Sequence, residues 1–512
     1  MKKFLSILVL FLAMFMFVAC GEEEKEDNKT NEDDKQGEVE DEKDPGEGEK
    51  DPEEGEKDPE EGNKEVDFTV PQDVNKEVKL TEAGKKGVAD LLTAFGAEEA
   101  NQMVEQVVPM VEMARLSDEQ VVEIAAIVTE NMAVIEKLMA LMESSKEVAP
   151  DEDYYEKLPM PLEVLDASQN EEEALPITAA EVKQAVKAVK DLLNAIGDDT
   201  IGLFLYNYIQ TMGEAMPFEI SLEAYVVESR IIMLMAKSIV GSISDADIDE
   251  VYTMMTGAQT DEAMARLVAI VKDTVNAINF DDSVWESYFA VINAEVKKLF
   301  ESPEFLAMLE GMMNDAEASS VMGLIYSSAI GLYEQVSKLT PAMIQYVVNV
   351  LDEVDAEFIG ISGKDYSTRH DYNWETNEEI VTYYINGKEV TKEEYEAAQS
   401  KLMKESINVF YNAYKKLSQK DKDAIVETVE VYLVLLDATM EEMFKQEMPG
   451  QNIDEFKYQG AKATLEEVFA ELDKVLAKEV ITEDDFMPLL EKAMGYAATK
   501  APLFVGMMLG NM

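Results

Sequence analysis

Apolar residues recur at spacings of three and four along most of the chain beyond residue 78. Because an α-helix has 3.6 residues per turn, this spacing puts one apolar stripe on each helix. The chain lacks the alternation of strands with helices that indicates a doubly wound α/β fold. The sequence therefore predicts an all-α fold, a multi-helix bundle or irregular array of about a dozen helices. One clear stripe consists of Val121, Ile124, Ala125, Val128, Met132, Ile135 and Leu138.

Several helix starts are marked by residues that satisfy the free amides of a first turn. Segments 117–120, 178–181 and 391–394 begin with Ser or Thr and end with Gln or Glu, which is the capping-box pattern. The pairs 302–303 (Ser-Pro) and 340–341 (Thr-Pro) place a capping residue before proline, which is favoured at the first helical position. We expect a helix to begin at each of these places.

Residues 363–391 break the helical pattern. Aromatic and polar residues alternate from Tyr366 to Trp374, as in a strand with one aromatic face. A second run, 379–385, is rich in β-branched and aromatic residues, and the Asn-Gly pair at 386–387 favours a tight hairpin turn. We therefore expect a small β-hairpin or three-stranded sheet, called the flap below, inserted between two helical regions.

The flap contains the only histidine of the chain and one of its two tryptophans. Aromatic faces bind sugar rings, peptides or cations. The structural alternative is that these rings only attach the flap to the helices. The flap is still the best candidate contact surface in the sequence, for a small ligand or for a protein or peptide partner. Its candidate binding residues are Tyr366, Arg369, His370, Tyr372 and Trp374.

The first 21 residues have the pattern of an export signal. Two lysines precede an apolar run, Phe4–Ala19, which is shorter than the roughly 20 residues of a spanning helix. The run ends with Ala19, Cys20 and Gly21, and this end resembles the lipobox of bacterial lipoproteins, although Phe17 stands where leucine is usual. The resemblance implies that residues 1–20 form a lipoprotein signal, that Cys20 carries a lipid, and that the chain lies on the outer face of a bacterial membrane.

Residues 21–77 are expected to form a disordered acidic stalk. They contain 26 acidic residues and 8 lysines but very few apolar side chains, so they cannot bury enough surface to offset the entropy of ordering. Beyond the stalk, the expected regions are a helical part at 78–362, the flap at 363–391 and a second helical part at 392–512. The stalk contains three copies of a seven-residue repeat, Glu42–Gly48, Glu49–Gly55 and Glu56–Gly62.

Charge and residue types exclude several classes of function. Residues 78–512 carry a net charge of −46, which repels nucleic-acid phosphates, so no nucleic-acid partner is expected. With His370 as the only histidine and Cys20 as the only cysteine, no metal, cofactor or catalytic residue is assigned. The three alternating aspartates at 245, 247 and 249 lack the glycine that a calcium loop requires, so they are interpreted as a solvated helix start.

One short segment suggests a second resemblance. Residues 385–395, a strand, an Asn-Gly turn, a strand and a capped helix start, are similar to a phrase found in extracytoplasmic foldases of the parvulin-associated type. The resemblance covers no isomerase domain, so it carries no catalytic residue. The preferred hypothesis is a non-catalytic binding or envelope-organising module anchored by its lipid. The alternatives are a chaperone-like holdase, the solute-binding lipoprotein of an importer and, last, a helical enzyme.

Overall fold

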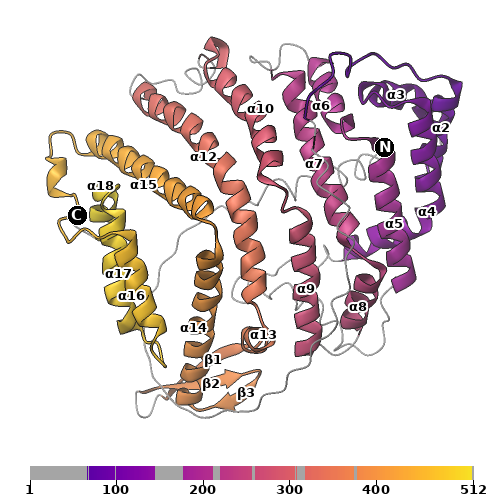
Figure 1. Ribbon diagram of the computed structural model, residues 1–512. Coiled ribbons are helices and arrows are strands. Elements are labelled where there is room, and N and C mark those ends of the chain that lie inside the picture. Colours follow the sequence, from indigo (N-terminus) through magenta and orange to yellow (C-terminus); the bar gives the residue numbers. More distant parts are fainter. Residues whose placement is uncertain are drawn as a thin grey trace. The chain divides into compact units, whose positions relative to one another are not determined.

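The computed structural model describes residues 66, 68–97, 100–144, 177–211, 220–256, 260–305, 307, 318–373 and 378–509. These parts of the chain contain 17 helices and one three-stranded sheet, which confirms the all-α fold with a small inserted sheet (Figure 1). The expected signal segment, Cys20 and the repeats of the stalk lie outside the described residues.

The chain divides into two compact units, with the boundary between Met308 and Leu309. The boundary thus falls within the region 78–362, which was expected to be one helical part. Unit 1 takes in the described residues from 68 to 307, and unit 2 takes in those from 318 to 509.

Unit 1 is built from helices that bury one apolar stripe each. Its first three helices enclose a core around Val88, Leu92, Val104 and Val121. Helix α2 packs against α3 and α4, α4 packs against α5, and α6 packs against α7. The helices are α2 (Glu82–Ala94), α3 (Ala100–Met113), α4 (Asp118–Ser144), α5 (Ala179–Ile196), α6 (Thr200–Thr211), α7 (Leu222–Ser242), α8 (Asp245–Thr256), α9 (Asp261–Ala277) and α10 (Asp282–Phe300).

The folded part of unit 1 begins earlier than expected. Phe68 is buried and its ring centroid lies 6.3 Å from that of Tyr288. Arg230 donates a hydrogen bond from Nη1 to the carbonyl oxygen of Thr69 at 2.9 Å, and Asn75 exchanges hydrogen bonds with Asn207. Residues 68–77 therefore belong to the folded body rather than to the stalk, because one buried ring and several long-range hydrogen bonds hold them.

Unit 2 is organised around a long helix, α12, which packs against α14 and α15. Ala342 of α12 and Ala413 of α14 are fully buried, and Asn349 donates a hydrogen bond from Nδ2 to the carbonyl oxygen of Ala413 at 3.2 Å. The helices of this unit are α12 (Ala318–Glu353), α13 (Ala356–Ser362), α14 (Lys392–Lys416), α15 (Gln419–Glu447), η4 (Ile453–Glu455), α16 (Leu465–Leu476), α17 (Glu483–Ala497) and α18 (Pro502–Met508).

Four of the five predicted helix starts are confirmed and one is wrong. Capping boxes form at Thr178 and Thr391, Gln120 and Ser117 bond reciprocally, and the Ser302 hydroxyl accepts from the amide of Phe305. At 340–341, however, α12 continues through the proline. The hydroxyl of the threonine donates back to the carbonyl oxygen of Val336 at 2.8 Å, so it acts inside the helix instead of capping a new one.

The flap has the predicted hairpin form. Strands β1 (Tyr366–Asn373), β2 (Glu378–Ile385) and β3 (Lys388–Val390) pair antiparallel in the order β1-β2-β3. Asn386 and Gly387 have φ of 51° and 68°, as a type I′ turn requires. The sheet lies beside α13 and the first part of α14 (Figure 1).

Among the described residues, none of the helices is both long enough and apolar enough to cross a membrane.

Candidate functional site

The base of the flap is attached to α14 by aromatic contacts. The rings of Tyr366 and Tyr383 lie with their centroids 6.1 and 5.1 Å from that of the buried Tyr395. The hydroxyl of Tyr366 donates to the carbonyl oxygen of Ile361 at 3.0 Å. Tyr366 therefore anchors the flap, which is the structural role that the sequence left open for these rings.

The distal end of the flap is exposed to solvent. Tyr372 is paired across the sheet with Glu379, and 43% of its surface is exposed. His370 lies on the same face, and its Nδ1 is 2.7 Å from Oε1 of Glu379. These side chains lie beyond the tyrosine contacts that attach the base of the flap to α14.

The opposite face of the distal flap carries different side chains. Arg369 pairs with Asp371, with Nε and Oδ2 3.1 Å apart, and both side chains are exposed. Beside them lies Ile380, half of whose surface is exposed. The five candidate residues thus do not form one site. Tyr366 lies at the base, His370 and Tyr372 share a distal face, Arg369 lies on the other face, and Trp374 lies outside the described residues.

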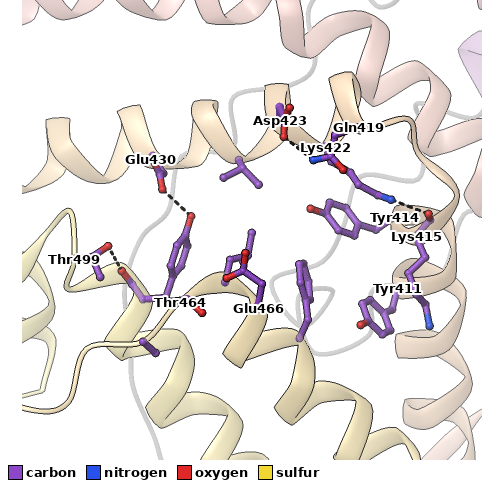
Figure 2. A pocket seen from close by; sticks show the side chains of 15 residues that line it. Tyr411, Tyr414, Lys415, Gln419, Lys422, Asp423, Glu430, Thr464, Glu466 and Thr499 are labelled. Atoms are coloured by element: carbon purple, nitrogen blue, oxygen red, sulfur yellow. Dashed lines mark hydrogen bonds between the residues drawn. The ribbon is translucent and has the colours of Figure 1, made fainter.

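A second candidate site in unit 2 was not predicted. A cleft of about 650 Å³ opens between the α14–α15 hairpin, the start of α16 and the end of α17 (Figure 2). The rings of Tyr411, Tyr414 and Phe469 form one wall, with the two tyrosine centroids 5.6 and 5.2 Å from that of Phe469. Tyr496 of α17 also lines the cleft. We call this site the aromatic cleft.

Two lysines lie at one end of the aromatic cleft. The Nζ of Lys415 lies 4.1 Å from the centroid of the Tyr411 ring, and that of Lys422 lies 5.8 Å from the Tyr414 ring. Lys422 donates from Nζ to the carbonyl oxygen of Lys415 at 2.9 Å, which satisfies a free carbonyl at the end of α14. In the described part of the chain, neither ammonium has a carboxylate within 4.0 Å.

The carboxylates of the cleft, in contrast, are already satisfied. Glu430 accepts a hydrogen bond from the hydroxyl of Tyr496 at 3.2 Å and pairs with Lys500 at 2.7 Å. Asp423 accepts from Nε2 of Gln419 at 2.8 Å. Hydrogen bonds from the first turn of α16 lower the pKa of Glu466, so this carboxyl stays ionised there. The cleft therefore carries mixed charges, with the ammonium groups of Lys415 and Lys422 gathered at one end.

The phenols of the cleft are neutral hydrogen-bonding groups. Burial raises the pKa of Tyr411 to about 12, and the charge of Asp473 adds to this shift. Burial and Glu430 raise the pKa of Tyr496 to about 12, and burial also raises the pKa of Tyr414. At neutral pH these hydroxyls donate hydrogen bonds and do not act as bases. Within the described ranges, no cluster of three or more metal-ligating side chains occurs. The arrangement is suited to binding.

The aromatic cleft escaped sequence analysis because its walls come from distant helices. Tyr411 and Tyr414 have helical spacing and are typical of an ordinary apolar stripe, whereas Phe469 and Tyr496 follow more than 50 residues later. The nearest local sign is the run of two tyrosines and a lysine at 411–415, which places a cation beside a ring on one helix face.

Comparison with known proteins identifies no family for this chain. No protein-family model, no curated protein and no solved structure matches the chain significantly.

Proposed function

We propose that this chain is a lipid-anchored extracytoplasmic binding module of a bacterial envelope, and that it acts without catalysis. Support for the address comes from the apolar run Phe4–Ala19 and the lipobox-like end at Cys20. Support for binding comes from the two sites of unit 2, the exposed side chains of the distal flap and the ring-lined aromatic cleft.

The observation that carries the proposal is the composition of the distal flap. Tyr372 and Ile380 lie on opposite faces of the same two strands, and 43% and 50% of their surfaces are exposed. Large apolar side chains that remain this exposed are available to contact another molecule. Exposed aromatic and aliphatic groups beside ion pairs are the usual composition of a protein contact surface.

The flap also offers a way to hold an extended peptide. Among the described residues, strand β1 (Tyr366–Asn373) has a strand neighbour on one side only, because the sheet order is β1-β2-β3. The free backbone groups of an edge strand can pair with an added strand. The proposed partner is therefore an exported protein or peptide that contributes an extended segment to β1.

In-cell crosslinking followed by mass spectrometry tests this proposal, with the full-length chain as bait. One variant carries His370→Ala, Tyr372→Ala and Ile380→Ala, and it keeps Tyr366 so that the flap stays attached. We expect one discrete partner with crosslinks that map to residues 366–385, and we expect this partner to be lost in the variant.

A matched variant controls for the loss of exposed apolar surface. Phe410→Ala and Tyr432→Ala remove two rings that are more than half exposed on α14 and α15, away from the flap strands. The partner should remain bound to this control. A partner that is kept by the flap variant, or crosslinks confined to other elements, would refute the assignment of the flap.

A holdase remains the second candidate, because unit 2 exposes several methionine side chains on its helices. Such methionines adapt to many shapes and suit the capture of unfolded clients. In the crosslinking experiment, many unrelated exported proteins, lost with the Phe410→Ala and Tyr432→Ala control and kept by the flap variant, would favour this function. The importer alternative finds no support, since the described residues form no α/β lobe. The exposed methionines are Met343, Met403, Met443, Met487 and Met508.

A further inference from the structure

We infer that the aromatic cleft binds a saccharide that carries a carboxylate group. The inference concerns a ligand that the proposed function does not name, and it stands or falls independently of the partner of the flap. Its starting points are the ring faces of α14, α16 and α17, the mixed polar groups between them, and the two lysines at one end (Figure 2).

The walls of the cleft suit a pyranose ring. Tyr411 is buried between Phe469 and the ammonium of Lys415, so it supports the wall from behind. Tyr414, Phe469 and Tyr496 are half-buried and line the open space. The faces of such rings pack against the C–H groups of a sugar, while a cleft of about 650 Å³ has room for about two sugar rings.

The polar lining suits hydroxyl groups. Thr464, Thr499 and Gln419 offer both donors and acceptors, and the carboxylate of Glu430 accepts hydrogen bonds at the end away from the lysines (Figure 2). Each hydroxyl of a sugar can donate one hydrogen bond and accept others. These exposed or half-buried groups can add hydrogen bonds to a polar ligand beside those that they already make within the chain.

The charges of the cleft select among sugars. A cationic ligand would meet Lys415 and Lys422, whose ammonium groups already lie over the faces of two rings. Asp423, Glu430 and Glu466 also line the cleft, and they repel a doubly charged phosphate more strongly than a single carboxylate. A single carboxylate at the lysine end meets the ammonium of Lys415, which has no acidic partner in the described part of the chain.

Three disaccharides that differ in one kind of group test the inference. Cellobiouronic acid and cellobiose have the same two rings and differ in the carboxylate at one C6 position, and deacetylated chitobiose carries amino groups instead. Their affinities are measured by calorimetry or NMR titration with the full-length chain in detergent. We expect cellobiouronic acid to bind on the order of ten times more tightly than cellobiose, because a charge-assisted hydrogen bond contributes about that factor.

Variants then assign the binding to the cleft. Lys415→Met should remove the preference for cellobiouronic acid over cellobiose, so that both bind with similar affinity. Phe469→Leu keeps an apolar side chain in the wall and should weaken both ligands by loss of the flat face. Lys401→Met, on the same helix but paired with Glu357, serves as the control and should change neither affinity.

Three results would overturn the inference. The first is a lack of binding by all three disaccharides. The second is preference for the amino sugar. The third is preference for the acid that survives Lys415→Met and Phe469→Leu, which would place the site elsewhere. The crosslinking partner of the flap does not enter this readout, so the two proposals fail separately.

Discussion

Tyr411 and Tyr496 are buried enough to resist ionisation well above the range of an ordinary phenol. An exposed tyrosine has a pKa of about 10. Burial raises the pKa of both side chains to about 12, and Asp473 and Glu430 respectively add to the shift because they repel a phenolate. Both residues are therefore expected to stay protonated at a pH where exposed tyrosines have ionised.

A spectrophotometric titration of the phenolate band measures this difference. The difference between the wild-type chain and Tyr411→Phe should appear as a single step with its midpoint at about pH 12. A midpoint near pH 10 would show that Tyr411 is not buried in this way. Because the folded-state pKa lies above the unfolded value, the stabilisation is complete below about pH 10 and is lost as the pH rises through about 12.

The same residues show the limit of prediction at this scale. Helical spacing correctly places Tyr411 and Tyr414 on one side of a helix. The rings that they contact depend on the packing of α16 and α17. Phe469 and Tyr496 come from these helices, and no local pattern in the sequence connects either residue with α14. Periodicity predicts the face of each residue, and tertiary packing decides its partner.

At the scale of elements, two helices of unit 1 approach each other closely at Gly202 of α6. A Cβ atom at this position would lie 2.1 Å from the carbonyl oxygen of Tyr225 and 2.6 Å from its carbonyl carbon, both backbone atoms of α7. Backbone cannot move aside as a flexible side chain can. Gly202→Ala should therefore separate α6 from α7 and lower the free energy of unfolding by about 1–3 kcal/mol or more.

A second glycine in the same pair of helices provides the control. At Gly241 of α7, an added methyl group would have no neighbouring atom within 4 Å, so Gly241→Ala should be neutral or stabilising by up to about 1 kcal/mol. Urea unfolding followed by circular dichroism compares the two variants. Equal stability of Gly202→Ala and Gly241→Ala would mean that α6 and α7 do not pack as closely as described.

Elements whose signals are local were predicted well. The capping box at Thr391 and the Asn386-Gly387 turn depend on neighbours within four residues, and both form as expected. The helix start predicted at the Thr-Pro pair 340–341 was wrong, because the same two residues also fit inside a helix when the hydroxyl donates to the preceding turn. The anchoring of residues 68–77 depends on Tyr288 and Arg230, which lie far away in the sequence, so composition alone could not predict it.

At the scale of the whole molecule, the formal net charge of −62 bears on how the chain is held at a membrane. Anionic lipid head groups repel a chain of this charge, because its acidic residues far outnumber its basic residues. Among the described residues no helix could span the bilayer. The attachment proposed above is a covalent lipid on Cys20, the only cysteine of the chain.

Cys20→Ala tests this anchor directly. The variant should be missing from the membrane fraction or remain as an unprocessed precursor of lower mobility, and it should incorporate no labelled fatty acid. Lys25→Ala, five residues beyond the cysteine, removes a charge but no attachment site and should behave as the wild-type chain does.

The amount in the membrane fraction and the mobility of the chain together separate a lipid anchor from other kinds of attachment. Each buried methylene contributes about 0.8 kcal/mol, so loss of the acyl chains removes most of the affinity for a bilayer. A Cys20→Ala chain that stays in the membrane fraction with unchanged mobility would show that a protein partner, and not a lipid, holds it there. Release by high salt would then identify an electrostatic contact, which the acidity of residues 78–512 could make only with a basic partner.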